Sequence, residues 1–252
     1  MTQIIESTNE WISLRTSVKD KTFGLVPTMG ALHAGHLELV KRSMRENDLT
    51  VVSIFVNPTQ FNDPKDFEKY PVQVEKDVAL LEELGVQYVF LPNYDEMYAD
   101  QYRYQVTEKE FSQTLCGAHR PGHFDGVLTI VLKLLNLAQA NKAYFGEKDF
   151  QQLTLIQGMV RSFFISTQII ACPIVRESDG LAMSSRNIRL SSLARKKSAM
   201  FPKILNEASS CEDARLQLLE QGFIVDYIEE HSNRRLGAIR IEDVRLIDNV
   251  QR

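Results

Sequence analysis

Two histidines, His33 and His36, lie three residues apart in a short loop that also holds Gly30 and Gly35. An apolar run precedes the loop and a stretch of helical periodicity follows it, so we expect a strand to turn into a helix here. The first N–H groups of a helix have no partner within the helix, and the positive end of its dipole favours anions. The loop therefore predicts a phosphate site on which both imidazoles could converge.

Two other segments carry groups that suit a phosphate. Gly146-Glu147-Lys148-Asp149 places a lysine where a helix is expected to begin. Lys148 can meet phosphate as a point charge, whereas Asp149 is placed to cap the helix. Met183-Ser184-Ser185-Arg186-Asn187 offers two hydroxyls and a guanidinium, which fit a phosphate or pyrophosphate. A Ser-Ser-Arg tripeptide alone is more often plain loop surface.

Other interpretations of the histidine loop have less support. A His-x-x-His pair could ligate a metal, but no third or fourth histidine or cysteine lies nearby to complete a zinc site. The loop also lacks the Gly-x-Gly-x-x-Gly of dinucleotide-binding enzymes and the Gly-Lys-Ser/Thr of the P-loop. A nucleotide site with a different fingerprint is the remaining prediction.

Apolar runs and helical periodicities alternate between residues 22 and 172, which favours a parallel, doubly wound (Rossmann-like) α/β sheet with right-handed crossovers. The segments His33–His36, Asn57–Phe61 and Gly146–Asp149 follow the first, second and fourth expected strands, so they should share one edge of the sheet. Residues 93–125 are expected to be an irregular, functional loop. The expected strands are 22–27, 51–56, 86–91, 143–145 and 169–172, and the expected helices are 35–46, 74–84, 130–137 and one from about 149.

The alternation of expected strands and helices ends at Pro173. A turn is expected at Asp179-Gly180, and a helix capped by Ser191 or Ser192 should follow. A further helix at 213–221 and short strands at 223–228, 238–241 and 244–247 complete a small α+β domain. The sequence thus predicts a Rossmann-like domain over residues 1–174 and a smaller α+β domain over residues 175–252.

The composition is that of an ordinary globular protein, with 252 residues, 44% hydrophobic residues and a formal net charge of -4. The acidic balance argues against nucleic acid as a partner, because phosphate backbones are normally met by clustered Lys and Arg. Cys116, Cys172 and Cys211 are odd in number and widely spaced, which favours reduced thiols. The first residues do not resemble a signal peptide and no apolar run could span a membrane. We expect a cytoplasmic protein without a membrane partner.

His33-Ala34-Gly35-His36 resembles the His-x-Gly-His element of the nucleotidyltransferase and class I aminoacyl-tRNA synthetase superfamily. With further motifs in order, the chain from residue 22 to about 190 is similar to the pantoate:beta-alanine ligase (pantothenate synthetase) family. The motifs that carry the resemblance are His33–His36, Phe55–Phe61, Arg120–Phe124, Gly146–Gln152 and Asp179–Asn187, followed by Arg245–Asn249 near the end.

The resemblance implies an AMP-forming acid:amine ligase of pantothenate biosynthesis. In this family the carboxylate of pantoate attacks the α-phosphorus of ATP, pyrophosphate leaves, and the amine of beta-alanine attacks the pantoyl adenylate to release pantothenate and AMP. Negative charge builds on the phosphoryl groups, so catalysis should consist mainly of positioning and electrostatic stabilisation. The resemblance also implies Mg2+ with ATP, a homodimer, and a C-terminal domain that acts as a lid over a nucleotide- and pantoate-binding domain.

The family's site residues carry over to matching positions of this sequence. His36 is the implied proton donor to the departing group. The implied catalytic residues are His33, His36, Lys148, Ser184, Ser185 and Arg186. Further implied ATP contacts are Met29, Gly30, Ala31, Leu32, Ala34, Gly35, Gly146, Glu147, Asp149, Val175 and Met183. Pantoate and beta-alanine are expected at Gln60, Gln152, Met29, Phe61, Arg120 and His123. The carboxylate that matches the family's acidic position for a metal is Asp77, although one aspartate on a helix is more often simply solvated.

Two departures from the family pattern keep other functions open. Val72 follows Tyr70-Pro71 where the family commonly has arginine, and the C-terminal domain is shorter than is usual. A nucleotidyltransferase that stops after transfer to a phosphorylated acceptor would share the histidine pair but would not account for Gln60 and Gln152, whose amides suit the oxygens of a small hydroxy acid. A catalytically silent nucleotide-binding protein is the third possibility.

Overall fold

The computed structural model describes residues 2–252. The chain divides into two compact units, the first made of the chain up to Gly146 with Gln151–Cys172, and the second of Glu147–Phe150 with Pro173–Arg252. The functional boundary between residues 174 and 175 stays a prediction. Across residues 2–252, no helix combines the length and apolar character needed to cross a membrane.

The first unit is an α/β layer structure. Its strands are β1 (Gln3–Ile5), β2 (Phe23–Thr28), β3 (Leu49–Ile54), β4 (Tyr88–Phe90), β5 (Lys142–Gly146) and β6 (Gln168–Cys172). Its helices are α1 (Thr8–Ser17), α2 (Ala34–Glu46), η1 (Pro58–Gln60), α3 (Pro64–Glu68), α4 (Val74–Leu84), α5 (Tyr94–Met97), η2 (Phe111–Gln113), α6 (Leu115–His119), α7 (His123–Ala138) and α8 (Phe150–Ser162), where η marks a short 3₁₀ helix.

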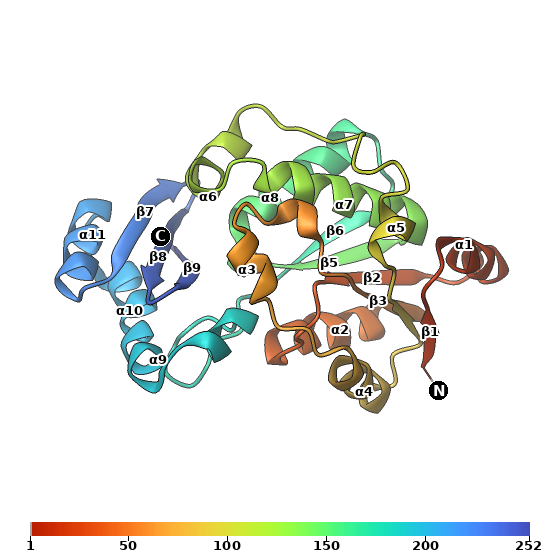
Figure 1. Ribbon diagram of the computed structural model, residues 1–252, viewed down its shortest axis with the longest axis horizontal. Coiled ribbons are helices and arrows are strands. Elements are labelled where there is room, and N and C mark those ends of the chain that lie inside the picture. Colours follow the sequence, from red (N-terminus) through yellow and green to blue (C-terminus); the bar gives the residue numbers. More distant parts are fainter. Residues whose placement is uncertain (1) are drawn as a thin grey trace. The chain divides into compact units, whose positions relative to one another are not determined.

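The six strands form one parallel sheet in the order β1-β4-β3-β2-β5-β6. Figure 1 shows α2 and α4 on one face of this sheet and α7 and α8 on the other. The central strands are therefore apolar on both faces, and Val26, Val51 and Val52 are completely buried. This arrangement confirms the predicted doubly wound α/β class.

Local sequence signals predicted several elements accurately. The helix expected over 35–46 is α2, and its following residue Asn47 ends it as predicted. The helix expected to close at Gly85 is α4, and Gly85 adopts the left-handed conformation that glycine permits, with φ of 78°. The prediction of five strands was wrong by one, because β1 was missed. This strand has only three residues and is stabilised by pairing with β4, which lies more than 80 residues away in the sequence.

The prediction that residues 93–125 form an irregular loop was also partly wrong. The segment contains α5, η2 and α6, and α7 already begins at His123. These short helices depend on distant partners that periodicity cannot reveal. Gln151 accepts a hydrogen bond from the Cys116 N–H at 3.0 Å and donates to the carbonyls of Phe111 and Thr114 at 2.7 and 2.9 Å.

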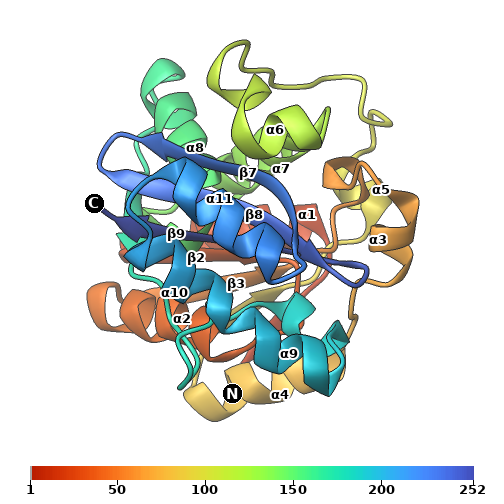
Figure 2. The same cartoon turned by 90° about the vertical axis from the view of Figure 1, so that its left-hand side faces the viewer.

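The second unit is the predicted small α+β domain. It contains η3 (Glu147–Asp149), η4 (Ser185–Arg189), α9 (Ser192–Ser198), α10 (Met200–Glu207), α11 (Cys211–Glu220), β7 (Ile224–His231), β8 (Arg234–Ile241) and β9 (Val244–Gln251). The three strands form an antiparallel sheet, along which α10 and α11 lie (Figure 2). Phe201, Leu205 and Leu218 are fully buried between these helices and the sheet.

Two local predictions for this unit are confirmed. Ser191 caps α9 by accepting the Ala194 N–H, and Gly180 ends a turn with φ of 90°. The strands are longer than expected, since each has 8 residues, and α10 was missed.

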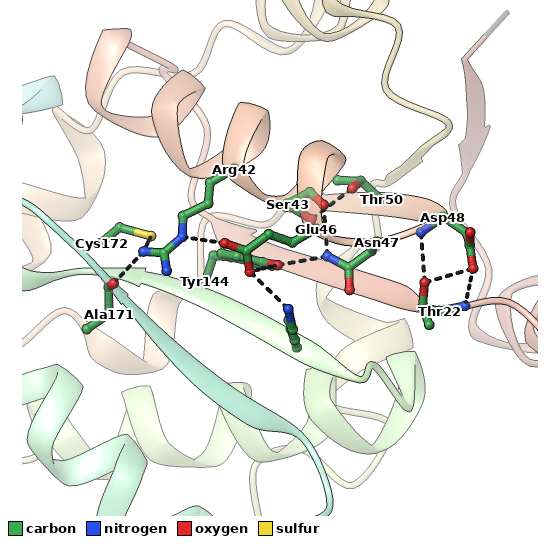
Figure 3. A network of polar contacts seen from close by, with 11 residues as sticks. Thr22, Arg42, Ser43, Glu46, Asn47, Asp48, Thr50, Tyr144, Ala171 and Cys172 are labelled. Carbon is green, nitrogen blue, oxygen red and sulfur yellow. Dashed lines mark hydrogen bonds and ion pairs between the residues drawn. The ribbon is translucent and has the colours of Figure 1, made fainter.

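The C-terminal end of α2 is held against the sheet by a polar network (Figure 3). Glu46 accepts hydrogen bonds from Arg42 at 2.8 Å, Lys142 at 3.1 Å and the Tyr144 hydroxyl at 3.1 Å. These donors, Arg42 first, lower the pKa of Glu46 to about 2. A Cβ at Gly24 of β2 would overlap the Ser43 hydroxyl, so the helix approaches the strand too closely for any residue larger than glycine.

We predict that Glu46→Gln lowers the free energy of unfolding by about 1–2 kcal/mol at pH 7, because charge-assisted hydrogen bonds to two cations are lost. The folded-state pKa is depressed from the ordinary 4.5 to about 2, so the contribution of Glu46 is present above pH 4.5 and is lost as the pH falls toward 2. Urea unfolding across this pH range measures it. Glu38→Gln is the matched control, since Glu38 is half exposed on the same helix and pairs with Lys41, and it should change stability by less than about 0.5 kcal/mol.

Candidate active site

The polar loops singled out in the sequence leave one edge of the first sheet. β2 pairs in parallel with β3 on one side and with β5 on the other. The three strands end at Thr28, Ile54 and Gly146, and the histidine loop, the Asn57–Phe61 segment and η3 follow directly in the chain. The prediction that the three loops begin at the same edge is therefore confirmed.

The two histidines cap α2 together. His33 is the N-cap residue, and its Nδ1 accepts the Gly35 N–H at 3.1 Å, while His36 Nδ1 accepts the His33 N–H at 3.4 Å. The rings stack with centroids 4.1 Å apart. Because both Nδ1 atoms act as acceptors, each neutral imidazole carries its proton on Nε2. The pair thus presents two Nε2–H donors from the start of the helix.

Several backbone N–H groups of this loop are bonded within the chain, and phosphate binding by the loop stays a prediction. The Gly30 N–H donates to Thr28 Oγ1 at 3.1 Å. The N–H groups of Ala31 and Leu32 donate to the two carboxylate oxygens of Asp77 at 2.7 and 2.8 Å. The N–H groups of His33 and Gly35 are bonded to the two imidazoles.

Asp77 is the anchor of this turn. Its side chain comes from α4 and is only 1% exposed, so the expectation of a solvated aspartate was wrong. Gly30 and Ala31 have φ of 80° and 49°, a left-handed pair that turns consecutive N–H groups toward one anion. Burial raises the pKa of the Asp77 carboxyl, against the opposing effect of the loop N–H groups.

Asp77 is also the metal ligand that the family resemblance implies. Both of its oxygens accept loop N–H groups in a buried position. Among the described residues, no group of three or more His, Cys, Asp or Glu side chains is arranged to hold a metal ion. Asp77 therefore organises the loop, and its role as a metal ligand stays a prediction.

A second cluster in the first unit is built around Gln60, at the end of η1. The Gln60 amide nitrogen lies 3.0 Å from Met29 Sδ, and its Oε1 accepts from Asn57 Nδ2 at 3.0 Å. Asn57 is 1% exposed, caps η1 and accepts the Tyr98 hydroxyl at 2.9 Å. Asn57 and Tyr98 were missed as site residues. The Asn57-Pro58 pair that follows β3 was the sequence signal for Asn57, while nothing local marks Tyr98.

Arg120 and His123 hold the backbone of Gln60. His123 Nδ1–H donates to the Gln60 carbonyl at 2.8 Å, and His123 Nε2 accepts from Arg120 Nη1 at 2.9 Å. Arg120 Nη2 also donates to the same carbonyl at 3.3 Å. A Cβ at Gly126 would overlap the Thr59 carbonyl, so α7 packs directly on η1. The structure thus brings Met29, Gln60, Arg120 and His123 together.

The two remaining substrate candidates of the first unit lie beside other structural groups. Phe61 packs edge-on against Phe67 and Tyr70, with ring centroids 5.3 and 5.6 Å away. Gln152 is half-buried in the first turn of α8, next to Gln151, which holds the α6 segment. The two adjacent glutamines therefore have different surroundings, and only Gln151 is fully buried.

In the second unit, the predicted ATP residues fall into one paired segment and two short helices. The Met183 N–H donates to the Val175 carbonyl at 3.0 Å, which places these two candidates side by side. Ser184 caps η4 by accepting the Arg186 N–H at 3.2 Å, and Ser185 begins that helix. Lys148 and Asp149 lie in η3, and the capping role of Asp149 stays a prediction.

A parallel α/β sheet whose carboxyl edge carries a His-x-Gly-His helix start defines an α/β enzyme of nucleotide-binding type. The family model described as pantoate-beta-alanine ligase matches residues 1–251. The chain belongs to this family and is a ligase.

Curated and solved relatives agree with this family over the full length of the chain. The pantothenate synthetase of Bdellovibrio bacteriovorus is 55% identical over 251 residues and covers 100% of both chains. That of Legionella pneumophila strain Lens is 52% identical over 248 residues and covers 98% of each chain. Because these relatives match from end to end, the short C-terminal domain is shared with them.

Two solved structures are similar to this chain. The pantoate-beta-alanine ligase of Francisella tularensis, complexed with beta-gamma ATP and beta-alanine, has a TM-score of 0.96 and 42% identity, covering 100% of this chain and 98% of that chain. The pantothenate synthetase of Thermus thermophilus has a TM-score of 0.92 and 38% identity, covering 100% and 99%.

We predict that Asp77→Asn lowers turnover in the ligase reaction by about 10–100-fold, because an amide NH2 would face a loop N–H and displace the histidine pair. Stability should fall as well, because a loop N–H would be left buried without an acceptor. Since burial raises the folded pKa of Asp77, its titration in the wild type favours the folded state at low pH, and this contribution is lost as the pH rises through that pKa. Thermal unfolding and steady-state kinetics at pH 7 measure the two effects.

Glu75→Gln is the matched control for this prediction, since Glu75 is exposed on the first turn of the same helix. It should leave turnover and stability unchanged. An Asp77→Asn protein that is folded and turns over normally would show that the loop does not need its anchor.

Proposed function

We propose that this chain condenses pantoate with beta-alanine in an ATP-dependent reaction, forming a pantoyl adenylate and releasing pyrophosphate and AMP, as a step of pantothenate biosynthesis. The observation that carries the proposal is the histidine pair, whose two Nε2–H donors stand at the sheet edge that also bears the Gln60 cluster. The family match over residues 1–251 supports the same reaction.

In the first unit, the proposed division of labour follows the chemistry of the side chains. His33 and His36 donate hydrogen bonds to phosphate oxygens of ATP, and His36 is the preferred proton donor to the departing group. Gln60 and Gln152 bind the hydroxyl and carboxylate oxygens of pantoate, which Met29 and Phe61 contact through its dimethyl carbon. Arg120 and His123 act through the backbone of Gln60, because both ring nitrogens of His123 are already bonded.

The second unit is proposed to supply the positive charge. Lys148 and Arg186 neutralise charge that develops on the phosphates, and Ser184 and Ser185 add hydroxyl donors. The backbone at Val175 is proposed to lie against the adenine, and its pairing with Met183 supports this, since the two candidates share one segment.

The remaining proposals concern the cation, the assembly and the compartment. Mg2+ is proposed to bind together with the phosphates of ATP. The family resemblance supports a homodimer, which sedimentation would establish, and the composition supports a cytoplasmic location.

An assay with ATP, pantoate and beta-alanine tests the proposed reaction. We expect pantothenate, AMP and pyrophosphate in equal amounts, and we expect no AMP when either pantoate or beta-alanine is omitted. AMP no higher than in these omission controls would refute the ligase. Pyrophosphate release with a phosphorylated acceptor would favour a nucleotidyltransferase, and ATP binding in calorimetry without any product would favour a silent binding protein.

We predict that His36→Ala lowers kcat by about 10²–10⁴-fold while the fold is retained. His36→Gln separates the two parts of the role, because its amide donates from about the position of Nε2 but cannot transfer a proton. Partial recovery in this variant would assign His36 to hydrogen bonding, and none would assign it to proton donation. His119→Ala, at an exposed histidine of α6, is the control, and near-normal turnover of folded His36→Ala would refute the assignment.

A further inference from the structure

The last strand of the chain carries a polar pair that the proposed reaction does not use. Asp248 and Asn249 of β9 are 3% and 2% exposed, in the Arg245–Asn249 motif noted in the sequence. Nδ2 of Asn249 donates to the backbone carbonyls of Glu147 and Lys148 at 2.9 and 3.1 Å. A buried amide about a hundred residues away thus fixes the peptide units on both sides of the Lys148 Cα.

Arg234 binds both the side-chain oxygen of Asn249 and the carboxylate of Glu147. Asn249 Oδ1 accepts from Arg234 Nη1 at 2.7 Å, and Arg234 Nη2 donates to Glu147 Oε2 at 2.6 Å. The orientation of the Asn249 amide is unambiguous, since arginine can only donate and backbone carbonyls can only accept. Glu147 is therefore held through both its backbone and its carboxylate.

Asp248 ties the same strand to the segment that precedes Ser184. Its carboxylate accepts two hydrogen bonds from Arg176 at 2.6 and 3.0 Å and one from the Asn249 N–H at 2.7 Å. Arg176 also donates to the Gly180 carbonyl at 3.0 Å. Adjacent residues of β9 thus hold both segments of the second unit that carry proposed phosphate-binding groups.

Packing alone gives no reason for this pair. The inner face of the antiparallel sheet is filled by apolar residues such as Ile239 and Leu246, and a buried carboxylate with its arginine is seldom more stable than apolar residues of the same volume. Polar groups retained at such a cost fix geometry where a precise position is needed.

We propose that Asn249 is a positioning residue that sets the backbone of Lys148 for the phosphates of ATP, with Asp248 and Arg176 aligning the segment before Ser184. This inference rests on the proposed role of Lys148 in binding ATP. Asn249 acts through Lys148, so its loss should weaken ATP binding and leave pantoate binding unchanged.

The test is a double-mutant cycle on the full chain. Asn249→Ala should raise the Kd for a non-hydrolysable ATP analogue and the KM for ATP by about 5–20-fold, with the KM for pantoate within about twofold of wild type. Lys148→Ala should weaken ATP binding further, and the double variant should be no weaker than Lys148→Ala alone. Effects that multiply in the double variant, or equal losses for ATP and pantoate, would overturn the proposal.

Two further variants serve as a control and as a substitute for Asn249→Ala. Asn233→Ala, at the exposed turn between β7 and β8, is the matched control and should change nothing. If Asn249→Ala does not fold, Arg234→Met takes its place in the same cycle, because it removes the partner of Asn249 Oδ1 and of Glu147 together. Binding of the analogue is measured apart from turnover. If the wild-type chain binds the analogue but makes no AMP from ATP, pantoate and beta-alanine, the ligase is refuted and the role of Asn249 in binding is still tested.

Discussion

The candidate site depends first on one buried carboxylate. The turn that leads into α2 places Gly30 and Ala31 in left-handed conformations, which leaves two consecutive N–H groups aimed at one point. Asp77 fills that point, and a buried N–H without an acceptor would cost far more than the turn itself gains. The position of the histidine pair follows from this turn, since His33 is the residue on which the helix begins.

The same helix is also fixed at its other end. Glu46 accepts hydrogen bonds from Arg42 of α2 and Lys142 of β5. Gly24 has no side chain, which allows α2 to pack directly on β2. A helix held at both ends can present its first residues with little freedom, which is what charge stabilisation in a phosphoryl-transfer reaction requires. The Gln60 cluster follows the same principle, because Asn57 and His123 hold its side chain and its backbone separately.

The sequence alone predicted the parts of the structure that depend on neighbours in the chain. The span of α2, the glycine stop at Gly85 and the Ser191 cap were predicted correctly because their causes lie within a few residues. The role of Asp77 was not, because its partners are 45 and 46 residues away and an aspartate on a helix has no local signal of burial. Asn249 was recognised as part of a motif, yet its contact with Lys148 spans 101 residues and could only come from the fold.

The course of the chain between the two units has a consequence for fragments and hybrids. Glu147–Phe150 is enclosed in the sequence of the first unit but belongs to the second, so the chain passes from one unit to the other three times. A gene cut once near residue 172 would leave Lys148 on a piece that lacks Asn249. A hybrid of two relatives joined at that point would combine a lysine segment from one parent with a β9 strand from the other. A hybrid that keeps the second unit from a single parent must therefore take both Glu147–Phe150 and Pro173–Arg252 from that parent.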